Sequence, residues 1–151
     1  MKTLLWLLLL VCATTVSHAQ VEVRKKQYNL KKDVALEGYD PVSYFDGQPK
    51  EGDEDITTVY KGVLYHFVSQ NNLTKFKAAP DKFEPAYGGW CAYAMGETGE
   101  KVKVDPETFK VIDGRVYLFY NFWGNNTLTD WNSQEKKLKD SADRNWRKFV
   151  Q

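Results

Sequence analysis

Beyond its first nineteen residues, the chain contains one cysteine, one histidine and one methionine, which are Cys91, His66 and Met95. A disulfide needs two cysteines, and a structural zinc site made of Cys and His needs about four ligands. Neither kind of crosslink can therefore form within one molecule. The fold must be held by its apolar core, and any soft-metal or thiol chemistry must use these three side chains.

Residues 1–19 have the pattern of a secretory signal peptide. A nearly continuous apolar run from Leu4 to Ala13 follows Lys2, and Ser17-His18-Ala19 places small residues at the first and third positions of a cleavage site. The run is too short for a spanning helix, which needs about 20 residues. We expect cleavage to leave a chain that begins near Gln20, has no membrane span, and is exported to the periplasm or the extracellular space.

The chain after the signal is suited to one domain. Residues 20–34 are polar and predict an N-terminal arm, and residues 35–151 form the predicted domain. Acidic and basic side chains are equal in number once Lys2 is removed, and no basic stripe is visible, so we expect no nucleic-acid partner. The acidic segment 48–55 predicts a solvated loop. The sequence shows no internal repeat.

Hairpins and short helices alternate along the predicted domain. Runs rich in β-branched and aromatic residues flank Lys61-Gly62 and Asp113-Gly114, two turn signals that predict hairpins. Ser69 is suited to cap a helix that ends before Pro80, and apolar residues recur at helical spacing over 127–149. This order predicts a single α+β domain, with a small antiparallel sheet of hairpins and several short helices.

Two of the three candidate site residues follow the Gly88-Gly89 pair. If this segment is helical, Cys91 and Met95 lie on one face, because they are four residues apart. A thiolate and a thioether form a soft pair that favours Cu(I). The start of a helix would also stabilise a thiolate and make it reactive. Both residue types also pack in apolar cores, and that alternative stays open.

The third candidate, His66, lies in a β-rich run. Strand alternation places Val63, Tyr65 and Phe67 on one face and His66 on the other. Histidine is the side chain that changes its charge near neutral pH. His66 would complete a Cys-His-Met site or act as a base toward Cys91, and a purely structural strand histidine is the alternative.

Two blocks in the chain resemble the exported YHS-domain family. They are Gly38-Tyr39-Asp40-Pro41-Val42 and Tyr87-Gly88-Gly89-Trp90-Cys91-Ala92, within a resemblance that spans about residues 35–149. The Tyr65-His66 pair matches the family's name, with Phe67 in the place of its serine. The family is described as a metal-binding module, so the resemblance implies a metal site that includes His66 and Cys91. Short relatives tend to use several cysteines, of which this chain keeps only Cys91.

These features predict an exported binding domain, rather than an enzyme, that holds copper through Cys91, His66 and Met95. One alternative is a redox or nucleophilic protein that uses the Cys91 thiol. Another is a domain that binds a small molecule or a protein without a metal.

Overall fold

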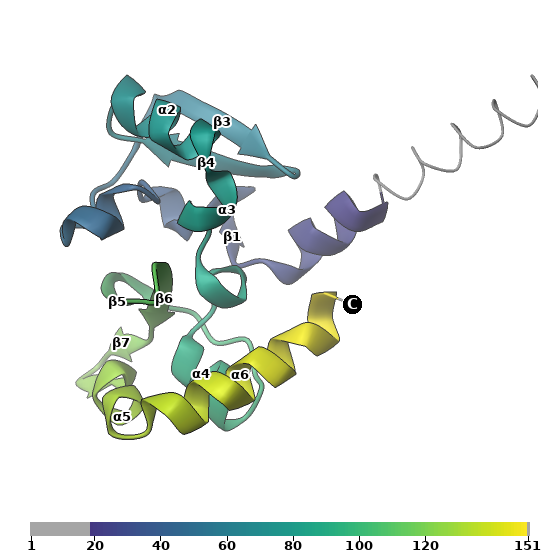
Figure 1. Ribbon diagram of the computed structural model, residues 1–151, viewed down its shortest axis with the longest axis vertical. Helices are drawn as coiled ribbons and strands as arrows, with labels where there is room; N and C mark the ends of the chain where they lie inside the picture. Colours follow the sequence, from purple (N-terminus) through teal and green to yellow (C-terminus); the bar gives the residue numbers. More distant parts are fainter. Residues whose placement is uncertain (1–18, 151) are drawn as a thin grey trace, which may run out of the picture.

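Two hairpins form where the turn signals predict them. Lys61-Gly62 and Asp113-Gly114 have the positive φ angles that a two-residue hairpin turn requires. The first turn joins β3 (Asp53–Tyr60) to β4 (Val63–Phe67), and the second joins β5 (Asp105–Ile112) to β6 (Arg115–Phe119). The computed structural model describes residues 19–150 (Figure 1), so the predicted signal peptide, except Ala19, lies outside the described residues.

The predicted N-terminal arm is attached to the domain instead of being loose. Residues 19–27 are helical, and β1 (Leu30–Lys31) and β2 (Val34–Ala35) form a further hairpin. The strand β2 pairs in parallel with β4, which gives the sheet order β1-β2-β4-β3. Arg24 forms an ion pair with Glu84, and the Trp90 indole donates to the Gln27 carbonyl at 2.7 Å. These contacts, which polarity alone does not reveal, hold the segment in place.

Short helices surround the hairpins, as the sequence predicts. Figure 1 shows the β3–β4 hairpin with α2 (Gln70–Ala78) at one end of the molecule, and the β5–β6 hairpin with α4 (Ala92–Glu97), α5 (Thr127–Ser133) and α6 (Glu135–Val150) at the other. The structure is thus a single α+β domain. Among the described residues, no helix is both long and apolar enough to cross a membrane. The 3-10 helices are η1 (Leu36–Gly38), η2 (Ser43–Asp46) and η3 (Ala86–Gly89), the α-helices are α2 (Gln70–Ala78), α3 (Pro80–Phe83), α4 (Ala92–Glu97), α5 (Thr127–Ser133) and α6 (Glu135–Val150), and the remaining strands are β7 (Asn121–Phe122) and β8 (Asn125–Asn126).

The two main hairpins repeat each other in structure. In β3–β4 a bulge separates the Asp53–Phe67 pair from the rest of the ladder, and β5–β6 has the same bulge after the Asp105–Phe119 pair, 52 positions later. The expectation of no internal repeat is therefore wrong, because register and packing are repeated while most side chains differ. Across residues 53–68 and their equivalents, the identical positions are Asp53, Val59, Gly62, Tyr65 and Phe67.

Each hairpin is covered by one helix through one large aromatic side chain. Phe76 of α2 is fully buried against Tyr65 and Phe67 of β4, with ring centroids 4.8 and 5.2 Å away. Trp131 of α5 is buried against the two equivalent rings of β6, at 5.8 and 5.4 Å. Burial of such rings supplies a large apolar area, so each half of the domain has its own aromatic centre.

A buried hydrogen-bond acceptor joins the elements of each half. The Asp40 carboxylate has no exposed surface, and it accepts from the Val68 backbone N–H at 2.9 Å and from the Asn72 amide at 2.7 Å. Cys91 occupies the corresponding place in the second half, where its Sγ accepts from the Tyr120 backbone N–H at 3.4 Å. Val68 and Tyr120 are again 52 positions apart. Each acceptor therefore links the end of its hairpin to the segment that precedes it.

Replacement of Asp40 should be one of the most destabilising single changes in the domain. Asp40→Ala leaves three buried donors without a partner, including the Val42 N–H that donates to it at 2.7 Å, and we expect a loss of about 3 kcal/mol in the free energy of unfolding. Urea unfolding followed by circular dichroism measures it. The exposed Asp46→Ala is the control, with an expected change within about 0.5 kcal/mol. Equal effects of the two variants would contradict the role of Asp40.

Candidate functional site

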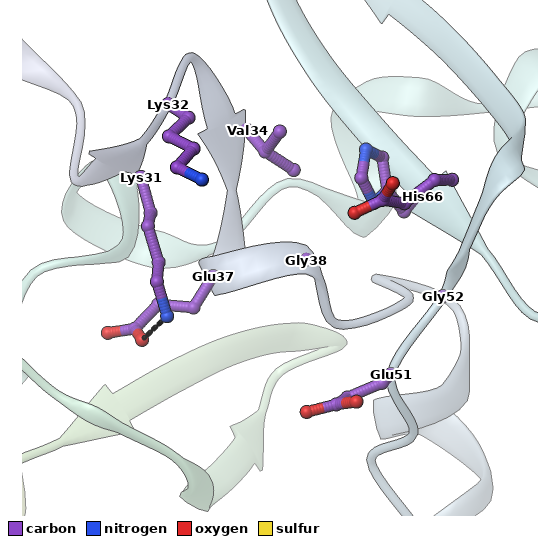
Figure 2. A pocket seen from close by; sticks show the side chains of 9 residues that line it. Lys31, Lys32, Val34, Glu37, Gly38, Glu51, Gly52 and His66 are labelled. Carbon is purple, nitrogen blue, oxygen red and sulfur yellow. Dashed lines mark hydrogen bonds and ion pairs between the residues drawn. The ribbon is translucent and has the colours of Figure 1, made fainter.

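A groove with a volume of about 270 Å³ opens beside β4 (Figure 2). The β1–β2 hairpin forms one wall, and η1 and the start of β3 complete it. His66 reaches the groove from β4 because Val63, Tyr65 and Phe67 point into the core, as strand alternation predicts. The lining of this His66 groove consists of Lys31, Lys32, Val34, Glu37, Gly38, Glu51, Gly52, Glu54 and His66.

Charges of both signs line the His66 groove. Lys31 and Glu37 neutralise each other in an ion pair of 3.3 Å. Lys32, Glu51 and Glu54 form no ion pair with any residue between 19 and 150. Figure 2 shows Lys32 and His66 on opposite sides of the opening, with Glu51 below them. The groove therefore offers two carboxylates, one ammonium group and one imidazole to a ligand.

The backbone beside the groove is strained. Leu36 and Glu37 have φ angles of 56° and 55°, and Gly38 follows at 98°. Lys32 and Asp33, at the turn of the β1–β2 hairpin, also have positive φ. A left-handed conformation costs a residue other than glycine about 1–2 kcal/mol. Such strain tends to collect at functional sites, where a side chain is kept despite its cost.

The second half of the domain shows what the fold itself requires at position 37. Its equivalent left-handed run is Tyr87-Gly88-Gly89, and Gly88 has a φ of 61° and a ψ of 20°, close to the 55° and 20° of Glu37. The same backbone conformation is thus adopted by glycine in one half and by glutamate in the other. Because Glu37 lines the groove, its side chain is the feature that distinguishes this half.

Two glycines lie beside His66 in the wall of the groove, and one of them, Gly52, allows a close approach. A Cβ atom at position 52 would lie 2.5 Å from the His66 carbonyl carbon, which no side chain tolerates. A Cβ at position 38 would lie 3.7 Å from the imidazole Nδ1, which is an ordinary contact, so glycine is favoured at position 38 by its φ of 98° and not by lack of space. The backbone of Gly52 also donates to the Gly38 carbonyl at 2.9 Å. The wall at Gly52 therefore lies directly against the backbone of His66.

The sequence singled out His66 as a ligand together with Cys91 and Met95, and it did not indicate the charged residues that line this groove. Glu51 and Glu54 belong to the segment 48–55, which the sequence predicts as a solvated loop, yet both line the groove. Lys32 lies in the segment predicted as a polar arm. No local motif marks these residues, because β2 reaches β4 only through long-range pairing.

Cys91 lies in the core, away from this groove. It has no exposed surface, its Sγ is 3.5 Å from Thr127 Oγ1, and its backbone N–H donates to the Val102 carbonyl at 3.0 Å. At the equivalent place in the first half, the backbone N–H of Asp40 donates to the Lys50 carbonyl at 2.8 Å. Cys91 therefore makes the contacts of a structural residue.

Met95 is also fully buried and packs in the core of the second half. It follows Cys91 by one turn, and its backbone N–H donates to the Cys91 carbonyl at 3.0 Å. Neither sulfur-bearing residue lines the groove that contains His66. In the part of the chain that the structure describes, no three His, Cys, Asp or Glu side chains are grouped to hold a metal ion.

Comparisons with family models, with curated proteins and with solved structures each give no match to this chain.

The Cys91 thiol should react slowly with alkylating reagents. Because it has no exposed surface, iodoacetamide can reach it only when the core opens, and the rate should rise steeply in urea. Mass spectrometry of the alkylated protein over time measures the rate. A rate in native buffer close to that of the unfolded chain would contradict this burial and favour a reactive thiol.

Proposed function

We propose that this protein is an exported binding domain and that the His66 groove holds a small molecule with both positive and negative charges. The proposal is based on three charged side chains that line the groove and form no ion pair with any residue between 19 and 150, the carboxylates of Glu51 and Glu54 and the ammonium group of Lys32. The backbone beside them is strained. Unpaired charges around a recess attract complementary charges.

The charge pattern favours a basic amino acid. With Lys31 and Glu37 paired to each other, two negative charges and one positive charge remain available. A ligand with two ammonium groups and one carboxylate, such as lysine, complements this set. Each contact would be a charge-assisted hydrogen bond, which is about twice as strong as a neutral one.

The lining of the groove favours binding over covalent catalysis. It contains no hydroxyl or thiol nucleophile. Lys32, Glu51 and Glu54 are exposed, so their side chains lack the desolvation that activates an amine or a carboxylate as a nucleophile. His66 and the carboxylates remain as hydrogen-bond partners that orient the ligand. This proposal corresponds to the alternative of a small-molecule-binding module without a metal.

Lysine should bind the protein more tightly than glutamate, whose charges oppose those of the groove. Isothermal titration calorimetry with L-lysine, L-arginine and L-glutamate measures this preference. Glu54→Gln and Lys32→Gln should each weaken lysine binding by about five- to tenfold, which corresponds to about 1 kcal/mol. Asp33→Asn, beside Lys32 but outside the lining, is the matched control. Absence of binding, or equal binding by all three amino acids, would refute the proposal.

Glu37→Gly should make the domain more stable while it weakens lysine binding. Glycine adopts the left-handed conformation of position 37 without strain, so we expect a gain of about 1 kcal/mol in the free energy of unfolding. Loss of Glu37 also frees the Lys31 ammonium group, whose charge then repels the positive charges of lysine. Asp33→Gly, at a φ of 67°, should stabilise to a similar extent and leave binding unchanged. Urea unfolding and calorimetry give the two readouts. Loss of stability in Glu37→Gly would contradict the assignment of strain to this residue.

Copper binding through Cys91, His66 and Met95 is a second candidate, in line with the resemblance to the exported YHS-domain family. It is favoured by one observation, the two soft sulfur ligands one turn apart at the start of α4. Both are buried, so the core would have to open for an ion to enter. Titration of Cu(I) into the protein and into Cys91→Ser tests it, since equal affinities would reject this site.

A further inference from the structure

The short hairpin between β6 and α5 is an addition to the repeated framework. Equivalent strand positions are 52 residues apart, but Phe76 of α2 corresponds to Trp131 of α5, which lies 55 positions later. The three additional residues fall within the segment 120–126, which forms β7 and β8. The first half passes from β4 to α2 through Val68 and Ser69 alone. The turn of this segment therefore has no counterpart in the first half, and we call residues 120–126 the aromatic hairpin.

Three aromatic side chains gather on the aromatic hairpin. The Tyr120 and Phe122 rings lie 5.0 Å apart between centroids, and Trp123 lies 6.0 Å from Phe122 and 6.4 Å from Tyr120. Trp123 is 94% exposed. The largest side chain of the group thus contributes almost no burial to the folded domain.

Trp123 also occupies an unfavourable backbone position. It has a φ of 52° and precedes Gly124 at 80°, which are the two turn positions of a hairpin that prefers Asn-Gly. A left-handed conformation costs a residue such as tryptophan about 1–2 kcal/mol. Neither core packing nor the turn therefore accounts for a tryptophan at this position.

The surroundings of Trp123 indicate a neutral and polar partner. Charged residues make up 27% of the chain, yet none occurs from Phe119 to Thr129. Nucleic acid and anionic membranes are bound through Lys and Arg, which this segment lacks. It offers aromatic faces and the exposed side chains of Asn125 and Asn126 instead. Amides both donate and accept hydrogen bonds, as sugar hydroxyls do.

We propose that the aromatic hairpin binds a neutral saccharide chain, with a sugar ring stacked on Trp123. The C–H face of a sugar ring is complementary to the negative face of an aromatic ring. The exposed Asn125 amide, two positions after Trp123, supplies a donor and an acceptor for sugar hydroxyls. The Asn126 oxygen caps α5 by accepting from the Leu128 backbone N–H at 3.0 Å, so Asn126 contributes only its NH2 group. This site is separate from the His66 groove, so either site can function without the other.

Calorimetric titration of the whole protein with cellohexaose, chitohexaose and maltohexaose tests the proposal. We expect binding of at least one of these sugars, with an affinity that falls about tenfold or more in Trp123→Asn, equivalent to about 1.4 kcal/mol. This variant creates the preferred Asn-Gly turn, so it removes the ring without harming the fold. Trp123→Phe should retain most of the affinity, and Val59→Ala, an exposed apolar change on the other half, should retain all of it.

Several results would overturn the proposal. They are the absence of binding to all three oligosaccharides and equal affinities of the wild-type and Trp123→Asn proteins. If no sugar binds, two further results would identify another partner, provided that Trp123→Asn abolishes them. One is sedimentation of the protein with phosphatidylcholine vesicles, and the other is self-association in analytical ultracentrifugation. The first of these would make the hairpin a membrane contact, and the second an interface between two copies.

Discussion

The buried carboxylate of Asp40 is the interaction on which the first half of the domain depends. A charged group without exposed surface is stable only when donors surround it, and three donors from separate segments do so here. They come from Val42, from Val68 at the end of β4, and from Asn72 on α2. The carboxylate thus fixes where the helix lies on the hairpin, and the aromatic contacts of Phe76 follow from that placement.

The same framework occurs twice with different acceptors at its centre. Cys91 takes the place of Asp40, and one backbone N–H and one hydroxyl surround its sulfur instead of three donors. A neutral sulfur has a lower cost of burial than a carboxylate, so it needs fewer partners. This equivalence gives Cys91 a structural reason to be buried, independent of metal or thiol chemistry.

Departures from the repeat coincide with both proposed sites. The first half carries Glu37 at the left-handed position where the second half carries Gly88, and that side chain lines the His66 groove. The second half carries an additional aromatic hairpin with Trp123 at its strained turn. In both places the chain carries a side chain that destabilises the local backbone. This is expected if the repeated framework provides stability and the added side chains provide binding.

The sequence alone determined the local elements of this protein, because turns, caps and strand alternation depend on residues that are close together in the chain. The glycine turns after Lys61 and Asp113 specify both hairpins, Ser69 specifies the start of α2, and alternation places His66 opposite the core face of β4. The same chemistry indicated the α+β class.

The tertiary structure alone decided which of these elements meet. Whether the Cys91 sulfur faces water or the core, whether Glu51 and Glu54 lie beside His66, and whether two dissimilar segments adopt one framework all depend on pairing between distant parts of the chain. Such contacts are set by packing and by buried hydrogen bonds, and these leave no pattern in neighbouring residues. The histidine was therefore visible in the sequence, while its charged partners and the repeated framework were not.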